Sequence, residues 1–331
     1  MILISFGTRP EWIKIKPLLE KMKGRIPYRL LFTGQHEDLL ANLKVDTDLV
    51  SLKIQNGPNR LDSIVSSSMN LEKAFDDITG VMVQGDTTSA FSIALAAFHR
   101  EIKVVHLEAG LRTYDKRQPF PEEFNRQAIS KIADVHLCPT KMSMDFLKKE
   151  RVQGRIEVVG NTVLDNLIDI ETRYDNIVVV TMHRRENHSN LDEWFKQIDA
   201  LAINNKNLDF VIPLHPNPNV QKHRHLLKNL KILKPMEYNE FISLLAKSRI
   251  VITDSGGLQE ESSFLKKKCI VCRQKTERLE GLGTFSFMCE RPERLKEVFA
   301  EVDKDHIPYG QCPYGSGYAA ENVYKVLKSE F

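Results

Sequence analysis

Short apolar runs alternate with helical segments along the whole chain, and this alternation restricts the fold more than any other feature. Such runs, separated by helical intervals of about 10–15 residues, are typical of βαβ units and parallel sheets. We expect strands at 1–6, 29–33, 81–84, 103–107, 135–138, 156–159, 177–182, 209–214, 230–233, 250–253 and 269–272. We expect helices at 11–23, 61–77, 88–99, 122–132, 161–173, 190–204, 240–248, 257–266, 292–302 and 318–329.

These elements form two groups of about 150 residues each, so the sequence predicts two Rossmann-like parallel-sheet domains. The boundary is expected at 168–176, within or just after the helix that begins at 161, because Asp175 and Asn176 open a new apolar strand. Parallel sheets of this kind place ligands in a crevice at the carboxyl ends of their strands. Residues that directly follow strands are therefore the first candidates for a site.

The composition is that of an ordinary globular chain, with 42% hydrophobic and 27% charged residues. The net charge of +3 is too small to indicate nucleic acid or an anionic membrane as a partner. We find no run of 18 apolar residues and no basic, cleavable leader, so we expect neither a membrane span nor a signal peptide. The five cysteines lack framework spacing, which indicates a reducing compartment and predicts a cytoplasmic protein.

Motifs for metals and dinucleotides are missing from the sequence. The ten histidines show no H-E-x-x-H or similar spacing. Cys269 and Cys272 form a C-x-x-C, but within a predicted strand their side chains point to opposite faces. A G-x-G-x-x-G fingerprint and a P-loop lysine are also absent. We therefore expect no metal and no hydride-transfer cofactor.

The segment 253–262, Thr-Asp-Ser-Gly-Gly-Leu-Gln-Glu-Glu-Ser, predicts a strand end, a turn of small residues and a helix start. Ser255, Gly256 and Gly257 lie where the helix begins, and a helix start offers unpaired N–H groups and the positive end of the dipole. The glycines let a phosphate approach this backbone closely. Glu261, a little over one turn later, can accept hydrogen bonds from a ribose diol. The segment indicates a nucleoside diphosphate site.

Other strand ends of the second half offer further groups for a nucleotide. His183, followed by two arginines, indicates an anion site in which the imidazole assists a departing phosphate. The alternative is a solvated basic loop. His215 ends the next strand, and Arg278 follows the strand at 269–272. Phe241 starts a helix beside the strand ends and either stacks on a base or belongs to the core.

Two basic residues follow the first strand. Arg9 and Lys14 lie at the start of a helix that Pro10 favours, in positions that suit a phosphate. The alternative is a capped helix whose basic side chains are solvated.

Three carboxylates lie at strand ends or helix starts of the first half. Asp86 follows a strand, where an N-cap is the alternative to a functional role. Glu108 ends a buried strand, where a carboxylate needs a reason to be present; the alternative is an ion pair with Arg112. Glu122 opens a helix and shares a face with Arg126. Clustered carboxylates can transfer protons or stabilise a cationic sugar.

Taken together, these motifs resemble one family, the non-hydrolysing UDP-N-acetylglucosamine 2-epimerases. Each motif alone is weak, but nine in family order over nearly the whole chain are specific. They are GTRPE 7–11, GDTT 85–88, HLEAGLRT 106–113, PFPEEFNR 119–126, VGNTVLD 159–165, HRRE 183–186, LHPNPNV 214–220, TDSGGLQEE 253–261 and TER 276–278.

The resemblance implies an architecture and an assembly. Family members have the two-Rossmann glycosyltransferase-B fold, with the active site in the interdomain cleft. Their C-terminal helix crosses back onto the first domain, so we expect residues 1–167 with 318–331 in one domain and 168–317 in the other. They are usually homodimers, need no cofactor, and serve nucleotide-sugar metabolism and polysaccharide biosynthesis.

The resemblance also implies a reaction, the interconversion of UDP-GlcNAc and UDP-ManNAc. UDP leaves anti to give 2-acetamidoglucal, then re-adds while a proton returns to the other face of C2. The family's acid–base carboxylates correspond to Asp86, Glu108 and Glu122, and its phosphate-side histidine corresponds to His183. Its UDP contacts correspond to Arg9, Arg126, Phe241, Ser255, Gly256, Gly257, Glu261 and Arg278, with Lys14 and His215 in the same motifs.

Three other classes of protein share part of this pattern. Hydrolysing relatives release ManNAc and UDP, but their motifs are of the GDR and GGE types where this chain has residues 85–88 and 108–110. A glycosyltransferase-B sugar transferase needs an acceptor site and does not need three carboxylates. A non-catalytic UDP-sugar sensor needs none of them. The motif types and the carboxylates together therefore favour the non-hydrolysing epimerase.

One motif predicts a difference in regulation. Family members that are regulated by their own substrate carry Gln-His-Arg-Gln/Glu-Met where this chain has Gln35-His36-Glu37-Asp38-Leu39. A second UDP-GlcNAc would meet the carboxylates of Glu37 and Asp38, and like charges oppose binding. We expect a hyperbolic rate curve for UDP-GlcNAc and conversion of UDP-ManNAc alone without a lag. A sigmoidal curve would show that the second site is retained.

Overall fold

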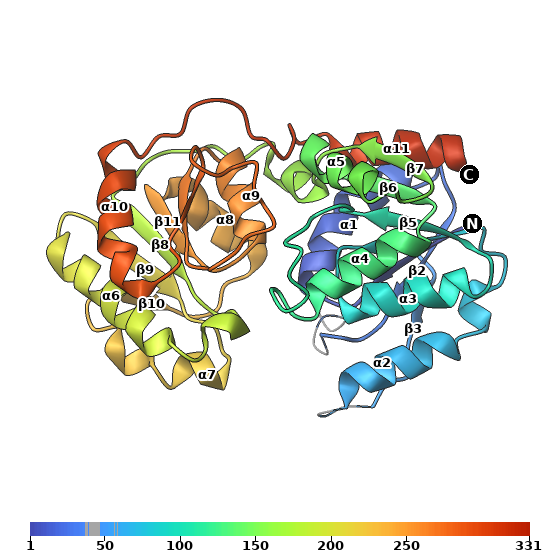
Figure 1. Cartoon of the computed structure of the whole chain (residues 1–331), viewed down its shortest axis with the longest axis horizontal. Helices are drawn as coiled ribbons and strands as arrows, with labels where there is room; N and C mark the ends of the chain where they lie inside the picture. Colours follow the sequence, from blue (N-terminus) through green and yellow to red (C-terminus); the bar gives the residue numbers. More distant parts are fainter. Residues whose placement is uncertain (37–38, 40–46, 56, 58) are drawn as a thin grey trace. The chain divides into compact units, whose positions relative to one another are not determined.

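The computed structural model describes all residues except 37–38, 40–46, 56 and 58. It divides the chain into two compact units, one formed by Met1–Asn166 with Gly315–Phe331 and the other by Leu167–Tyr314. Each unit is a parallel sheet with helices packed on it (Figure 1), which confirms the prediction of two Rossmann-like domains. Within the part of the chain so described, no helix has both the length and the apolar character needed to cross a membrane.

The first unit contains a seven-stranded parallel sheet with the order β3-β2-β1-β4-β5-β6-β7. The strand order reverses between β1 and β4, and open α/β sheets bind their ligands at such a switch point. The strands are β1 (Ile2–Phe6), β2 (Tyr28–Phe32), β3 (Leu49–Ser51), β4 (Gly80–Gln84), β5 (Lys103–Leu107), β6 (Val135–Cys138) and β7 (Arg155–Val158).

Helices cover both faces of this sheet. They are α1 (Arg9–Met22), α2 (Arg60–Met69), α3 (Thr88–Phe98), α4 (Glu122–Ile132), α5 (Lys141–Lys149) and α11 (Ala319–Glu330). Alternate residues of β1 show the two layers, because Ile2 and Ile4 pack in one cluster with α1 and α11, whereas Leu3 packs in another with α3. Burial on both faces explains why the central strands are apolar throughout.

The second unit contains a six-stranded parallel sheet with the order β10-β9-β8-β11-β12-β13. Its strands are β8 (Ile177–Thr181), β9 (Asp209–Pro213), β10 (Lys231–Leu233), β11 (Ile250–Thr253), β12 (Lys268–Val271) and β13 (Ser286–Met288). Its helices are α6 (Leu191–Asn204), α7 (Pro218–Gln221), α8 (Tyr238–Lys247), α9 (Gly257–Phe264) and α10 (Leu295–Lys304).

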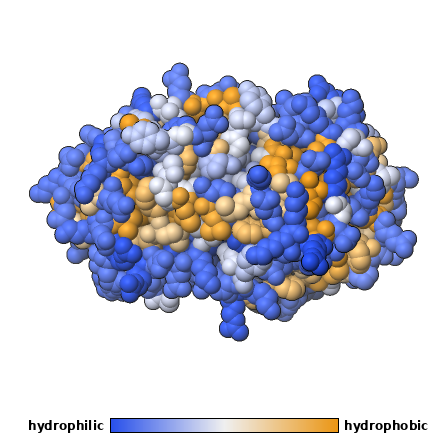
Figure 2. All heavy atoms as spheres, turned by 45° about the horizontal axis from the view of Figure 1, so that its top comes forward, coloured by the Kyte–Doolittle hydropathy of each residue, from blue (hydrophilic) through white to orange (hydrophobic). Residues whose placement is uncertain are grey.

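Hydrophilic residues cover most of the face shown in Figure 2, with hydrophobic patches between them. Some large hydrophobic side chains of the first unit are exposed on neighbouring helices. Phe98 on α3 is 51% exposed, and Phe124 on α4 is 47% exposed. Phe124 also meets the ring of Phe91 on α3 edge to face, with centroids 5.8 Å apart.

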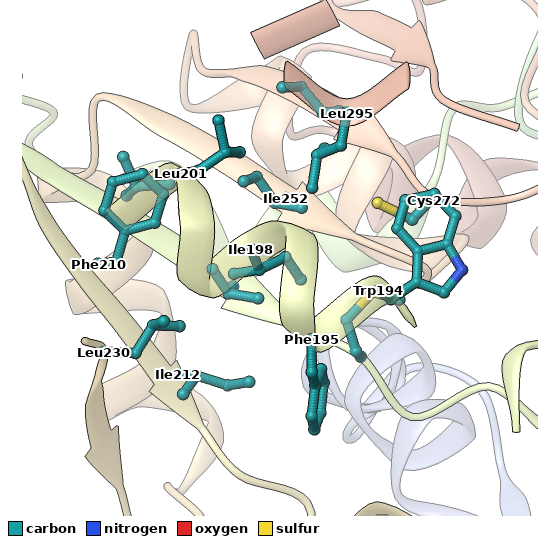
Figure 3. Packing of buried hydrophobic residues seen from close by; sticks show 14 of the residues in the cluster. Trp194, Phe195, Ile198, Leu201, Phe210, Ile212, Leu230, Ile252, Cys272 and Leu295 are labelled. Carbon is teal, nitrogen blue, oxygen red and sulfur yellow. The ribbon is translucent and has the colours of Figure 1, made fainter. Parts of the chain in front are cut away.

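The core of the second unit is built around α6 (Figure 3). Trp194, Phe195 and Ile198 lie on one side of this helix, and each is at most 1% exposed. They pack in one cluster with Phe210 of β9 and Ile252 of β11. This packing fixes the strands, and with them the turns at their carboxyl ends.

One predicted helix is wrong. The chain forms a short 3-10 helix at Thr162–Leu167 where a helix over 161–173 was expected. The Asn161 side chain accepts a hydrogen bond from the backbone N–H two residues on (3.1 Å), and such local bonds compete with helix formation. The Asp165 carboxylate instead accepts bonds from the first two N–H groups of α11 (3.0 and 2.9 Å).

Smaller differences concern short elements. The three-residue strands β3 and β13 and the four-residue helix α7 were not predicted, because elements of this length show no measurable periodicity. Helix α5 was also missed. The helix predicted over 61–77 ends at Met69, and a separate 3-10 turn follows at Lys73–Phe75.

Candidate active site

Three turns of the first unit carry predicted site residues, namely two of the acid–base carboxylates and one UDP contact. Arg9 opens α1 after β1, Asp86 lies in the turn after β4, and Glu108 directly follows β5. Because these strands are parallel neighbours, their turns lie at one edge of the sheet. Glu108 has a φ of 66°, which is uncommon for a residue other than glycine. Such backbone strain is concentrated at functional sites.

The Glu108 carboxylate is held by three donors. Lys14 Nζ and Gln84 Nε2 both donate to Oε2, and Asn161 Nδ2 donates to Oε1 at 3.4 Å. The Glu108 side chain is only 5% exposed. A buried carboxylate contacted by an ammonium and two amides is compensated as an anion, the form that accepts a proton. Lys14, which we expected beside a phosphate, contacts this carboxylate.

The ion pair considered between Glu108 and Arg112 is wrong. The Arg112 guanidinium makes a bidentate pair with Glu150, with Nε–Oε1 and Nη2–Oε2 distances of 2.8 and 3.0 Å. It also donates to the Ser130 hydroxyl at 2.8 Å. Arg112 thus connects α4 with the end of α5. Glu108 instead accepts hydrogen bonds from the group that includes Lys14.

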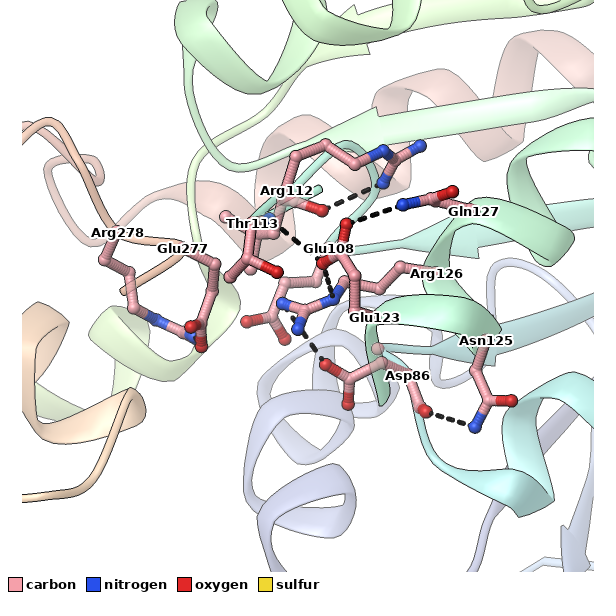
Figure 4. Close-up of polar contacts among 12 residues, drawn as sticks. Asp86, Glu108, Arg112, Thr113, Glu123, Asn125, Arg126, Gln127, Glu277 and Arg278 are labelled. Atoms are coloured by element: carbon pink, nitrogen blue, oxygen red, sulfur yellow. Dashed lines mark hydrogen bonds and ion pairs between the residues drawn. The ribbon is translucent and has the colours of Figure 1, made fainter. Parts of the chain in front are cut away.

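Asp86 is connected to α4 by two contacts (Figure 4). Its carboxylate lies 3.6 Å from Nη1 of Arg126, and its backbone carbonyl accepts a hydrogen bond from Asn125 Nδ2 at 2.8 Å. Arg126 is 1% exposed and also lies 3.4 Å from Glu123. Glu122, the first residue of α4, is half-buried. The structure therefore places Asp86 next to the helix that Glu122 opens.

Glu11, in the matched motif at 7–11, is a buried carboxylate close to these turns that was not among the predicted residues. Thr8 caps α1, and its backbone N–H and hydroxyl both donate to Glu11 Oε2 at 2.7 Å. Burial raises the pKa of the Glu11 carboxyl, while these hydrogen bonds act in the opposite direction. The capping-box spacing of Thr8 and Glu11 is the signal that could have identified it.

In the second unit, a buried aspartate organises the turn that contains His183. Asp254 directly follows β11 and is fully buried. It accepts hydrogen bonds from the backbone N–H groups of His183 (3.0 Å) and Arg184 (2.9 Å), and from Asn187 Nδ2 (3.2 Å). Asp254 was not predicted as a site residue, because its partners lie about 70 residues away along the chain.

His183 and His215, both predicted for the phosphate side, lie together. Their rings are stacked with centroids 5.1 Å apart and planes inclined by 19°. Burial lowers the pKa of His183, although the nearby Asp254 carboxylate acts in the opposite direction. The Asn217 N–H donates to Nδ1 of His215 at 3.1 Å, so a neutral His215 carries its proton on Nε2. The pair thus offers N–H donors to an anion.

The start of α9 has the predicted geometry for a phosphate. The helix begins at Gly257 without a side-chain cap, and the Ser255 N–H is bound by Thr253 Oγ1 at 2.9 Å. A Cβ built at Gly257 meets nothing within 4 Å, whereas one at Gly256 comes within 2.7 Å of Arg278 and Glu277 side-chain atoms. The two glycines therefore have different roles: Gly256 makes room for protein groups, and Gly257 borders open space.

The two glycines give a matched pair of substitutions. We expect Gly256→Ala to lower the melting temperature, because its Cβ displaces the buried Arg278. We expect Gly257→Ala to leave the melting temperature unchanged or higher, since alanine favours helices, and yet to weaken UDP binding. Thermal unfolding and calorimetry with UDP measure the two effects. Unchanged UDP affinity in Gly257→Ala would show that the phosphate does not bind at this helix start.

Arg278 is part of a buried ion-pair group. Its Nε donates to Glu260 on α9 at 3.0 Å, and its Nη1 donates to Glu277. Glu277 also lies 3.3 Å from Arg273. Arg278 is 5% exposed, and its carbonyl accepts a bond from the Tyr314 hydroxyl at 3.3 Å. The guanidinium is thereby held against the start of α9.

The two residues predicted to bind the nucleoside are Glu261 on α9 and Phe241 on α8. The Tyr238 hydroxyl donates to Glu261 Oε1 at 2.8 Å, so α8 packs against the buried part of α9. Phe241 lies on α8 three residues after Tyr238, on the same face, and is half-buried. Both predicted nucleoside residues therefore lie on the contacting helices α8 and α9.

The motif at 35–39, for which we predict a difference in regulation, lies partly outside the described residues. Glu37 and Asp38 lie outside the described residues. Gln35 precedes them, and its Oε1 accepts a hydrogen bond from the Ser89 hydroxyl at 2.7 Å. His36 is bound through its backbone N–H to the Gly7 carbonyl at 2.7 Å. The expected hyperbolic kinetics remain a prediction.

Two Rossmann-like parallel-sheet units define the class of glycosyltransferase-B-like proteins. MurG of Acinetobacter baumannii shares this fold with the chain at a TM-score of 0.54 and 13% identity, over 99% of each chain. Within this class, the chain belongs to the UDP-N-acetylglucosamine 2-epimerase family, because the family model of that description matches residues 20–328.

Individual relatives agree with this assignment. The UDP-N-acetylglucosamine 2-epimerase of Campylobacter jejuni is 36% identical over 375 residues, covering 98% of this chain and 97% of the relative. The crystal structure of UDP-GlcNAc 2-epimerase from Neisseria meningitidis, bound to UDP-GlcNAc, has a TM-score of 0.88 at 32% identity and covers 99% of each chain. The family resemblance predicted from the motifs is confirmed.

Proposed function

We propose that the chain catalyses the reversible C2 epimerisation of UDP-GlcNAc to UDP-ManNAc without net hydrolysis. The observation that carries this proposal is the Glu108 carboxylate, buried and compensated as an anion by Lys14, Gln84 and Asn161, with Asp86 in the turn after the neighbouring strand β4. A positioned carboxylate of this kind can remove a carbon-bound proton only when the chemistry makes that proton labile.

Departure of UDP supplies that condition. The C2 proton of the sugar is not acidic in the substrate, because no carbonyl is adjacent. When the C1–O bond breaks, its electron pair leaves with the UDP oxygen and C1 becomes cationic. A carboxylate then takes the C2 proton, and the C–H electrons form the C1–C2 double bond of 2-acetamidoglucal. Return of UDP to C1 and of a proton to the opposite face of C2 gives the epimer.

The two units supply different parts of this reaction. We assign proton transfer to Asp86, Glu108 and Glu122 of the first unit, with Arg9 and Arg126 as UDP contacts. In the second unit, we assign the diphosphate and the nucleoside to residues at strand ends and on α8 and α9. These residues are His183, His215, Phe241, Ser255, Gly256, Gly257, Glu261 and Arg278.

Product analysis separates this function from its alternatives. With UDP-GlcNAc alone, we expect an equilibrium mixture of two UDP-sugars and no accumulation of free UDP. A hydrolysing epimerase would release ManNAc and UDP in equal amounts. A sugar transferase would leave the substrate unchanged until an acceptor is added. Chromatography of the nucleotides in a single incubation therefore tests the proposal.

We further propose that the chain acts as a homodimer in nucleotide-sugar metabolism. Phe98 and Phe124, which are exposed on the contacting helices α3 and α4, are candidates for burial in such an interface. Sedimentation should give twice the chain mass of 38.0 kDa. A monomer at micromolar concentration would contradict this assembly.

A further inference from the structure

A buried carboxylate outside the proton-transfer group links two turns of the first unit. Glu11 lies in the first turn of α1 and is 2% exposed. Its Oε2 accepts hydrogen bonds from the N–H groups of Gly7 (2.9 Å) and Thr8 (2.7 Å) after β1. Its Oε1 accepts a bond from the Thr87 hydroxyl (2.7 Å) after β4. One side chain therefore ties together loops separated by 76 residues.

Thr87 brings this link next to Asp86. It directly follows Asp86 and is the N-cap of α3, where its Oγ1 accepts a hydrogen bond from the Ala90 N–H at 3.0 Å. A hydroxyl has one proton, so donation to Glu11 leaves its lone pairs free for Ala90. Glu11 thereby sets both the place and the direction of the Thr87 hydroxyl.

We propose that Glu11 and Thr87 are positioning residues that hold Asp86 where proton transfer requires it. The inference rests on the proposed epimerase function, and neither residue is assigned a contact with the substrate. A carboxylate suits this place because four donor groups converge on it, namely two N–H groups and two hydroxyls. A glutamine would present an NH2 group to some of these donors.

A second contact restricts movement between the turns that follow β1 and β4. The Thr33 hydroxyl donates to the Ser89 hydroxyl at 2.6 Å, beside the turn after β1. A Cβ at Gly7 would come within 2.1 Å of Thr33 Oγ1 and 2.5 Å of Ser89 Oγ, so the two turns are packed without spare room. Close-packed groups transmit a displacement instead of absorbing it. A shift at Glu11 should therefore reach Asp86.

The test compares two substitutions of Thr87. Thr87→Val keeps the side-chain shape and removes the hydroxyl, and we expect kcat for epimerisation to fall about tenfold or more. Misplacing a catalytic group by about 1 Å can cost about 100-fold. KM and UDP affinity should change little, because Asp86 is assigned to proton transfer at the sugar and not to UDP binding. Thr87→Ser keeps the hydroxyl and should restore most of the lost kcat. Glu11→Gln should behave as Thr87→Val.

Ser92→Ala is the matched control. It removes a buried hydroxyl of the same helix that, among the described residues, donates within α3 to the Thr88 carbonyl at 2.7 Å, and should leave kcat unchanged. Native kcat in Thr87→Val would overturn the inference, as would an equal fall in Thr87→Ser. If Thr87→Val fails to fold, native kcat in Glu11→Gln decides against it. An inactive native protein would refute the proposed function itself, which separates the two failures.

Discussion

Replacing Glu108 with glutamine is expected to lower turnover at least about 100-fold, the scale of general acid–base catalysis. The amide has nearly the same size as the carboxylate but does not take up a proton at neutral pH. It also loses the charge that pairs with Lys14. UDP affinity should change little, because this carboxylate is assigned to the sugar. Initial rates with UDP-GlcNAc and calorimetry with UDP measure the two quantities separately.

Other carboxylates of the first unit provide the comparison for Glu108. Asp86→Asn and Glu122→Gln should reduce turnover on the same scale. Glu157→Gln removes a carboxylate that is 42% exposed and pairs only with Arg155 at 3.0 Å among its recorded ion pairs, so it should leave turnover unchanged. Near-normal turnover in Glu108→Gln would show that this carboxylate does not transfer the proton.

Removing the Glu261 carboxylate is expected to weaken UDP binding by about 1–3 kcal/mol, the range for a hydrogen bond to a charged group. The corresponding rise in Kd is about 5- to 150-fold. The loss should appear with UDP alone, because the ribose is common to UDP and the UDP-sugars. Phe241→Ala should weaken binding within the same range if its ring stacks on the uracil.

Glu240→Ala is a suitable control for these substitutions. It removes an exposed carboxylate from α8, the helix that carries Phe241, without touching α9. Tyr238→Phe tests whether the hydroxyl at 2.8 Å orients Glu261, and a smaller loss than in Glu261→Ala is expected. Unchanged UDP affinity in both Glu261→Ala and Phe241→Ala would show that the nucleoside binds at another part of the protein.

The sequence predicted the fold because its periodicity is strong. Helix α4 was expected at 122–132 and occupies Glu122–Ile132, and β5 occupies the expected residues 103–107. The helix expected over 161–173 failed because the Asn161 side chain bonds the backbone N–H of Val163 and the Asp165 carboxylate bonds the first N–H groups of α11. Local pattern therefore predicted most of the longer elements, although helix α5 and the shortest strands and helix were missed.

The site could be predicted only in part, for a related reason. Strand-end positions selected Asp86, Glu108 and His183 as candidates, because topology alone places such residues at one edge of a sheet. Their partners are long-range: Asn161 reaches Glu108 across 53 residues, and Asp254 binds the His183 backbone across 71. Such pairings leave no mark in a single sequence, which is why Arg112 was considered as the partner of Glu108.

In the proposed reaction, the proton at C2 exchanges with solvent, and UDP returns to C1 instead of being released. Native protein should be incubated with UDP-GlcNAc in deuterated water, and both UDP-sugars analysed by mass spectrometry and proton NMR. We predict one deuterium at C2 of UDP-ManNAc, deuterium entering the recovered UDP-GlcNAc, and no accumulation of free UDP. UDP-ManNAc that keeps protium at C2, or release of UDP in step with free ManNAc, would contradict the account.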